Sequence, residues 1–358
     1  MEGKIEFIES IGKIVVFTML LLSVFLFTVK TKNKVSNRLF GIYLLVIAFD
    51  LTGLFSGKIL EYPNLNALKV ASSLLQLPLF YLYVLSACYS NFKIIIKHSI
   101  HGLLFVLFWV LFVVTKFSNW VTILYEIVVE LQFIGYIMAV FIALKKYKTI
   151  YLENYSSTKA IIYKWLFNIT LFSCIAHSFV VFRWYLANST FQEYLIYVNI
   201  LISISVLLIT VYFALSALYK PEIFTGININ IEPLASQQKG AISKKITTSE
   251  NDALLKLEKF MNSEKPYLDF ELTLQKLATQ IDIPEKSLSL LINRHLDKHF
   301  FDFINSYRIE EAKHLLRNET LTIQQIMYEV GFNSKSSFNT AFKKHTSETP
   351  SNFRKSVN

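Results

Sequence analysis

The feature that most constrains this chain is a series of seven long apolar runs up to residue 219, followed by a polar C-terminal stretch. A run of about 20 apolar residues is long enough to cross a hydrocarbon core about 30 Å thick. The runs cover approximately 11–29, 39–56, 70–90, 99–117, 121–144, 165–187 and 195–219, and the fourth is the shortest. Because helices satisfy their own backbone hydrogen bonds in lipid, the runs predict an all-α fold that begins with a seven-transmembrane-helix bundle.

Composition argues against an ordinary soluble enzyme. Hydrophobic residues make up 53% of the chain and charged residues 17%, whereas soluble domains carry about 25% charged residues. The first run lacks a small-x-small cleavage site and leads into basic residues and a second apolar run, so we interpret it as a span rather than a signal peptide. Cys88 and Cys174 both lie in apolar runs. No disulfide framework and no closely spaced metal-ligand pair is predicted from them.

The basic residues predict the orientation in the membrane, because cytoplasmic loops accumulate Lys and Arg. One alternating set of loops holds eleven of them: Lys30, Lys32, Lys34, Arg38, Lys93, Lys97, Lys145, Lys146, Lys148, Lys159 and Lys164. The other set holds only Lys58, Lys69, Lys116 and Arg183. We therefore expect a multi-pass membrane protein, with its N-terminus outside and everything after Lys220 in the cytoplasm.

The net charge of +10 does not by itself indicate nucleic-acid binding. Residues 220–358 contain nineteen Lys and Arg against seventeen Asp and Glu, so most of the excess lies in the apolar part. Any case for DNA binding in the tail rests on its sequence pattern instead. By composition we divide the chain into a membrane domain (1–220), a polar linker with Gly and Pro (221–249) and a C-terminal domain (250–358).

The C-terminal domain repeats a pattern of helix, tight turn and helix. Its first helix is expected at 252–260, after a candidate cap at Ser249. The two paired segments and the amphipathic helix between them are predicted at 272–278 with 284–293, at 322–330 with 334–344, and at 301–316. Proline at 284 suits a first helical turn. The fold predicted for the whole chain is therefore a helical bundle followed by a cytoplasmic double helix-turn-helix domain.

Particular residues at fixed spacing strengthen this interpretation. They are Leu277 and Ala278; Phe303, Tyr307, Arg308 and Ala312; Ile326, Val330, Gly331, Phe332 and Phe338; and Thr349, Pro350, Phe353 and Arg354. In combination they resemble the DNA-binding domain of the AraC/XylS family of bacterial transcription regulators, over about a quarter of the chain. A polytopic anchor on such a domain resembles membrane-bound regulators of Bacteroidota, which implies that the protein lies in a bacterial inner (cell) membrane.

Departures from the family pattern fall mostly at its usual glycines. Asp282 and Asp297 stand at two of them, and Ser347 with Glu348 at a third region. Asp tolerates left-handed geometry better than most residues, so we expect Asp282 to adopt it. Met327 replaces a small alanine, which predicts looser packing in the second unit. The first recognition helix is expected to sit slightly differently from the family pattern.

The resemblance also implies which residues face DNA. They are Lys286, Ser289, Leu290, Asn293 and Arg294 in the first unit, and Lys335, Ser336, Ser337, Asn339, Thr340, Lys343 and Lys344 in the second. Asn pairs with adenine and Lys reaches guanine or phosphate; Arg294, Lys343 and Lys344 are expected at phosphates. A linking helix of about 16 residues spans roughly 24 Å, which with its turns suits successive major-groove faces about 34 Å apart. For any single residue, a solvated helix face is the competing interpretation.

Ionisable residues in the apolar runs are functional candidates, because charge in hydrocarbon is costly. They are Asp50, Glu126, Glu130, His177 and Arg183. One hypothesis is an outward-facing polar pocket that senses a ligand, with Arg183 paired to a carboxylate. The alternative is that Arg183 and Glu126 extend to the interface while the others join helices.

The expected function is a one-component regulator that binds promoter DNA in response to an external or membrane signal. Its expected partners are promoter DNA, the lipid bilayer, RNA polymerase and an unknown signal ligand, and a homodimer is left open. No cofactor, metal site or catalytic constellation is predicted. The alternative is a transporter or membrane enzyme whose tail is a regulatory or docking module. Proteolytic release within the linker is a third hypothesis.

Overall fold

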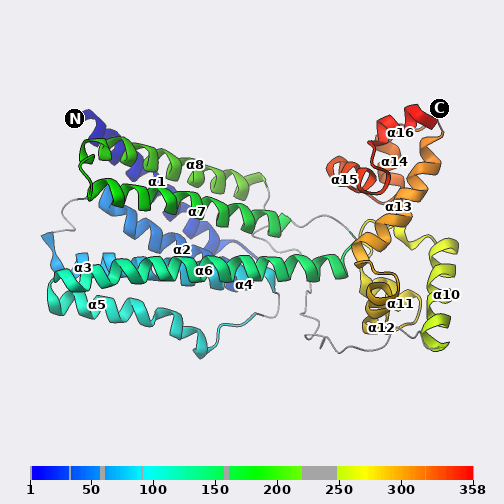
Figure 1. Cartoon of the computed structure of the whole chain (residues 1–358), viewed down its shortest axis with the longest axis horizontal. Helices are drawn as coiled ribbons and strands as arrows, with labels where there is room; N and C mark the ends of the chain where they lie inside the picture. The colour runs from blue at the N-terminus through cyan, green and yellow to red at the C-terminus, as the bar shows by residue number, and fades with distance from the viewer. Residues whose placement is uncertain are drawn as a thin grey trace. The chain divides into compact units, whose positions relative to one another are not determined.

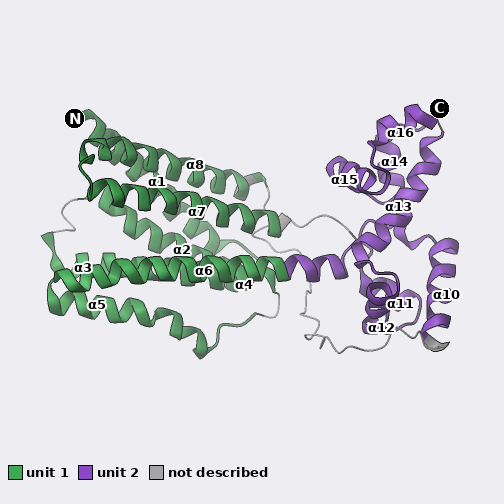
Figure 2. Ribbon diagram, viewed as in Figure 1, with its two compact units in different colours: residues 1–146, 161–232 green, residues 147–160, 233–358 purple. Residues whose placement is uncertain are grey.

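The computed structural model describes residues 2–31, 34–56, 61–89, 92–156, 161–219, 248–318 and 320–357. Every regular element among these residues is a helix, apart from one isolated antiparallel bridge. The chain divides into two compact units, 1–146 with 161–232 and 147–160 with 233–358 (Figure 2). Residues 221–247 of the predicted linker lie outside the described residues, and so do Lys32, Lys58, Lys159 and Lys220.

The first unit is built from apolar helices of different lengths. They are α1 (Glu2–Thr28), α2 (Lys34–Leu51), α3 (Pro63–Ser72), α4 (Gln76–Cys88), α5 (Leu103–Thr115), α6 (Asn119–Asn154), α7 (Ile161–Ala187) and α8 (Leu195–Tyr219) (Figure 1). Among the described residues, seven helical stretches are long and apolar enough to cross a membrane. Each overlaps one of the predicted runs, so the expected helices are confirmed, and their crossing of a bilayer stays a prediction.

These helices pack through small apolar clusters. Helix α1 lies against α2 and α8, α2 against α4, α3 against α5, and α7 against α8. One cluster joins α1 to α2 through Val15, Met19 and Ala48. Another joins α3, α5 and α6 around Phe108 and Phe112. The remaining apolar surface of the unit is extensive, because many large hydrophobic side chains on the same helices are exposed.

A proline shapes the third apolar stretch. Pro78 has no N–H, so the carbonyl of Leu74 loses the partner that a regular helix would give it. The chain forms a 3-10 turn at Ser73–Leu75 just before α4. The side chain of Gln132, on α6, donates to the Leu74 carbonyl at 3.1 Å. A polar residue of one apolar helix thus satisfies the backbone of another.

Helix α6 is longer than any apolar run predicts. Its 36 residues correspond to about 54 Å, whereas a hydrocarbon core is about 30 Å thick. The predicted run ends at residue 144, but the helix continues through Lys145, Lys146 and Lys148 to Asn154. Its last residues, from Tyr147 onward, belong to the second unit.

The described part of the second unit contains, besides the end of α6, seven α-helices. They are α10 (Thr248–Ser263), α11 (Leu274–Gln280), α12 (Glu285–Leu290), α13 (Phe300–Leu316), α14 (Ile323–Glu329), α15 (Lys335–Thr346) and α16 (Pro350–Val357). The predicted helix pairs and linking helix are confirmed, with boundaries shifted by a few residues. The predicted cap Ser249 is wrong, because α10 already begins at Thr248.

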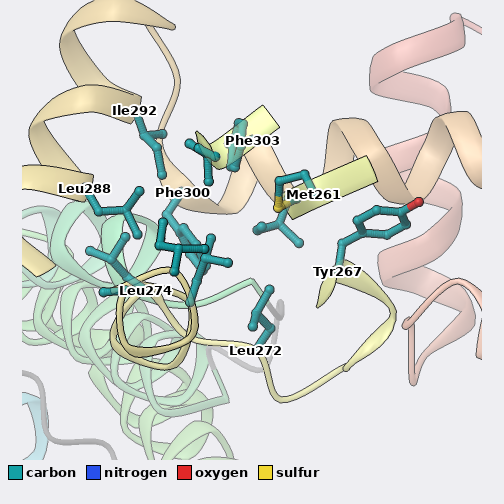
Figure 3. Packing of buried hydrophobic residues seen from close by; sticks show 13 residues of the cluster. Met261, Tyr267, Leu272, Leu274, Leu288, Ile292, Phe300 and Phe303 are labelled. Atoms are coloured by element: carbon teal, nitrogen blue, oxygen red, sulfur yellow. The ribbon is translucent and has the colours of Figure 1, made fainter. Parts of the chain in front are cut away.

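Helix α13 is shared by two hydrophobic cores. Its first half contributes Phe300, Phe303 and Ile304 to a cluster that also contains Leu277 and Leu288 (Figure 3). Its second half supplies Ile309, Ala312 and Leu316 to a separate cluster with Ile326, Phe338 and Phe342. Each helix pair therefore packs on its own part of one helix, which fixes the two pairs within a single domain.

Candidate nucleic-acid interface

The first helix pair is α11 and α12, joined by a tight turn at Asp282. Thr273 caps α11 by accepting a hydrogen bond from the Lys276 N–H at 3.1 Å. Asp282 has a φ of 51°, so the predicted left-handed geometry is confirmed. After Leu290 the second helix continues as a π-helical turn, Leu291–His295, and Asp297 is also left-handed at φ 49°.

The outer face of α12 differs in part from the prediction. Lys286 and Arg294 are exposed, and Leu290 and Asn293 are half-buried. Ser289 is only 2% exposed, and its hydroxyl accepts a hydrogen bond from the Asn293 amide at 3.3 Å. The side chain of Ser289 therefore holds Asn293 in place rather than presenting a surface to a base.

One exposed position of this face was missed in the sequence. Ser287 is exposed and lies between the exposed Lys286 and the buried Leu288. The apolar spacing of Leu288, Leu291 and Ile292 marks the inner face of the helix. In a regular helix residues 287 and 289 lie about equally far from that face, on opposite sides of it, so helical periodicity alone did not single out Ser287.

The second helix pair is α14 and α15, and both helices start with a capping side chain. Thr322 and Gln325 form a capping box in which each side chain bonds the other residue's backbone N–H. Ser334 caps α15 by accepting from the Ser337 N–H at 3.2 Å. Gly331, in the turn between the helices, has a φ of +83°. These local bonds define where the second recognition helix begins.

Helix α15 has a buried apolar stripe and a polar outer face. The stripe is formed by Phe338, Ala341 and Phe342. On the outer face, the predicted DNA-facing residues that are exposed are Lys335, Ser336, Thr340, Lys343 and Lys344, while Ser337 and Asn339 are half-buried. The Ser337 hydroxyl is 2.7 Å from that of Ser334, so it takes part in the cap.

The end of α15 is basic and is tied to α13. The Lys344 ammonium donates to the Asp302 carboxylate at 2.6 Å. To contact a phosphate, Lys344 must give up the Asp302 carboxylate or share its ammonium with it. The position of Lys344 in the sequence did not indicate this contact. Burial and the charge of Lys344 lower the pKa of the adjacent His345. A neutral His345 leaves Lys343 and Lys344 as the positive charges at this end of the helix.

The ionisable candidates of the first unit have separate partners. The Asp50 carboxylate accepts from Lys69 at 3.5 Å and from Gln76 at 3.2 Å. His177 lies 2.9 Å from the Glu130 carboxylate. These contacts are helix-to-helix bonds, as the alternative interpretation expected for Asp50, Glu130 and His177.

Arg183 differs from the prediction. Its guanidinium donates to the amide oxygen of Asn199 at 2.8 Å, so it does not use a carboxylate in this bond. Glu126 is next to Tyr125, whose hydroxyl donates to the Val70 carbonyl. A cavity of about 510 Å³ lies in the same unit, but its lining includes Tyr81, His101 and Tyr136 and none of the five candidates. The contacts of the described residues therefore do not bring the five candidates into one pocket.

Comparison with known proteins concerns the C-terminal part of the chain. Residues 277–356 match a family model described as a helix-turn-helix domain. The chain is 30% identical over 121 residues to the HTH-type transcriptional regulator GlxA of Rhizobium meliloti. The aligned stretch is 34% of this chain and 36% of that protein. It is 29% identical over 91 residues to the HTH-type transcriptional regulator AlkR of Acinetobacter baylyi, and this stretch is 25% of this chain and 28% of that protein. The chain thus spans about a third of the length of these relatives.

A solved structure gives a similar match. The C-terminal domain of the two-component response regulator yesN from Fusobacterium nucleatum is 30% identical to the aligned part of this chain. The alignment covers 29% of this chain and 98% of that chain, with a TM-score of 0.26.

Proposed function

Because residues 277–356 are a helix-turn-helix domain of the AraC type, we propose that this protein is a membrane-anchored transcription regulator that binds promoter DNA through two recognition helices. The observation that carries the proposal is the shared architecture of α12 and α15. Each is the second helix of a pair, buries one apolar face on α13 and presents exposed basic and polar residues on its outer face. A helix with such a face fits the major groove, where its side chains reach base edges.

The length of α13 supports use of both helices on one DNA site. Its 17 residues correspond to about 25 Å, and successive major-groove faces are about 34 Å apart. Lys335 and Asn339 are four residues apart on the outer side of α15, one turn from each other. We assign base reading to this pair, and phosphate contacts to Lys343 and Arg294.

The membrane anchor is supported by the surface of the first unit. Soluble monomers seldom expose a contiguous apolar patch larger than a few hundred Å². In α5, however, Leu103 and Val114 are 61% and 72% exposed among other apolar side chains. Lipid stabilises such a surface and water does not, so we place the unit in a bacterial cytoplasmic membrane with the C-terminal domain in the cytoplasm. The bilayer, promoter DNA and RNA polymerase are the partners this function implies.

The test is genome-wide DNA occupancy of the tagged full-length protein. Lys335→Ala with Asn339→Ala should abolish discrete promoter peaks, because both changes remove base contacts. The matched control is Lys256→Ala with Asn251→Ala, which removes the same side chains from exposed positions of α10 and should keep every peak. Absence of specific peaks for the unaltered protein, when it is present in the membrane, would refute the proposal.

A signal that acts through the membrane half is part of the proposal. A ligand that carries such a signal must bind two conformational states of the protein with different affinities, since equal binding does not shift the equilibrium between them. Replacing residues 1–146 and 161–219 by an inert anchor should therefore change promoter occupancy or target transcription. If neither changes, the membrane half only localises the domain.

A further inference from the structure

A buried arginine in the DNA-binding unit has acceptors from two distant parts of the chain. Arg308, on α13, is 1% exposed. Its Nε donates to the Tyr267 carbonyl at 2.7 Å, and its Nη2 to the Asp269 carbonyl at 2.8 Å. Burial lowers the pKa of the guanidinium to about 10, against the opposing charge of Asp269. Because burial removes water from the guanidinium, each of its N–H groups that faces the protein needs an acceptor there.

The other two hydrogen bonds of Arg308 end on Ser156. Nη1 donates to the Ser156 carbonyl at 3.0 Å, and Nη2 to the Ser156 hydroxyl at 3.2 Å. The Ser156 hydroxyl in turn donates to the Leu272 carbonyl at 2.7 Å, and the side chain is as buried as Arg308. Ser156 therefore provides the guanidinium with a backbone and a side-chain acceptor and is itself satisfied.

The preceding residue pairs with the same stretch of the domain. Tyr155 forms the isolated antiparallel bridge with Thr273, and the Ser156 N–H lies 3.4 Å from the Leu272 carbonyl. Thr273 is the capping residue of α11, so the bridge is at the start of the first helix pair. Burial and the nearby charge of Glu285, the first residue of α12, contribute to raising the pKa of Tyr155 to about 12.

The segment that makes these contacts follows α6 directly. Residues 147–160 group with the helix-turn-helix domain rather than with the apolar helices (Figure 2). No motif of the domain includes them, since they precede its first helix by about ninety residues of sequence. Without Ser156, two hydrogen bonds of a buried guanidinium would be lost, and an unsatisfied charged donor costs more than a neutral one.

We propose that Tyr155–Ser156 is a built-in docking peptide for a socket formed by Arg308, Tyr267, Asp269 and Leu272, and that α6 acts on the first helix pair through it. The partner of this surface is a segment of the same chain. The effect on DNA rests on the proposed function, whereas the docking contact does not.

The contact is tested by disulfide trapping in the full-length protein in lipid nanodiscs. Tyr155→Cys and Thr273→Cys are combined in a background with Cys88→Ala and Cys174→Ala, and a protease site is inserted at 234–240. Bridged residues have Cα atoms about 4.5–5.5 Å apart, within the disulfide range of about 4.4–6.8 Å. After oxidation and cleavage the two fragments should stay joined, and each single-cysteine protein should separate. Separation of the double variant would overturn the docking contact.

A charge introduced into the socket tests its role. Ser156→Lys places an ammonium beside the Arg308 guanidinium, so trapping should fall at least tenfold and promoter occupancy should change. The control Ser263→Lys adds the same side chain at an exposed position on α10 and should alter neither. Lost trapping with unchanged occupancy would overturn the action of α6 on DNA binding.

The two proposals fail in different ways. If trapping fails while promoter peaks depend on Lys335 and Asn339, the docking contact is wrong and the proposed function stands. If trapping succeeds but the protein has no promoter peaks, the proposed function is wrong, and so is the action of docking on DNA.

Discussion

Replacing Gly331 by alanine should strongly destabilise the second helix pair. The residue has a φ of +83°, which costs an L-residue about 1–2 kcal/mol. A Cβ at this position would lie 2.7 Å from the Tyr267 carbonyl oxygen and 2.8 Å from that of Leu268. Both are backbone atoms, so relief requires the chain to move, at a packing cost of about 1–3 kcal/mol. The expected loss is about 2–5 kcal/mol, a large part of a typical domain stability of about 5–15 kcal/mol.

The assay is urea-dependent pulse proteolysis of the full-length protein in nanodiscs, detected with a C-terminal tag. Ser347→Gly is the reciprocal control, because Ser347 is left-handed at φ 63° and glycine adopts that geometry without strain. Its midpoint should stay the same or rise, while that of Gly331→Ala should fall sharply. A Gly331→Ala protein within about 0.5 kcal/mol of the unaltered one, the range of ordinary surface substitutions, would refute the steric argument.

Three further changes have outcomes of defined direction. Thr322→Ala removes the capping box of α14 and should lower the unfolding free energy by about 1 kcal/mol in the same proteolysis assay. Lys343→Ala should reduce the slope of log binding constant against log salt by about 0.9 if this lysine contacts one phosphate, as measured by DNA titration at several salt concentrations. The pKa of His345 is lower in the folded protein than its value of about 6.5 in the unfolded chain, so the free energy of unfolding should fall as the pH drops below about 6.5. His345→Gln should flatten that decline between pH 7.5 and 5.5 in the same proteolysis assay.

Local patterns predicted the helices of both units because their causes are short in range. An apolar run determines where a long helix forms, and the spacing of Thr322 and Gln325 determines where one begins. The left-handed turn at Asp282 was likewise readable from its position between two helices. In each case the interacting groups are within a few residues of each other.

Burial of particular polar side chains was less predictable. Ser289 matched a DNA-facing position by resemblance, but the π-helical turn and core packing place it inside, bonded to Asn293. Lys344 was expected at a phosphate and contacts Asp302, 42 residues earlier. Arg183 was expected to pair with a carboxylate and instead bonds Asn199.

The sequence by itself determined the seven apolar helical stretches and the two C-terminal helix pairs that are present among the described residues, because periodicity, capping and turn residues act locally. Only the tertiary structure decided which side chains meet across that framework. The bonds between Arg308 and Ser156 join residues 152 positions apart, and neither residue's neighbours in sequence indicate the other. A buried guanidinium takes its acceptors from whichever segments the fold brings to it, so its partners follow from packing rather than from any local pattern.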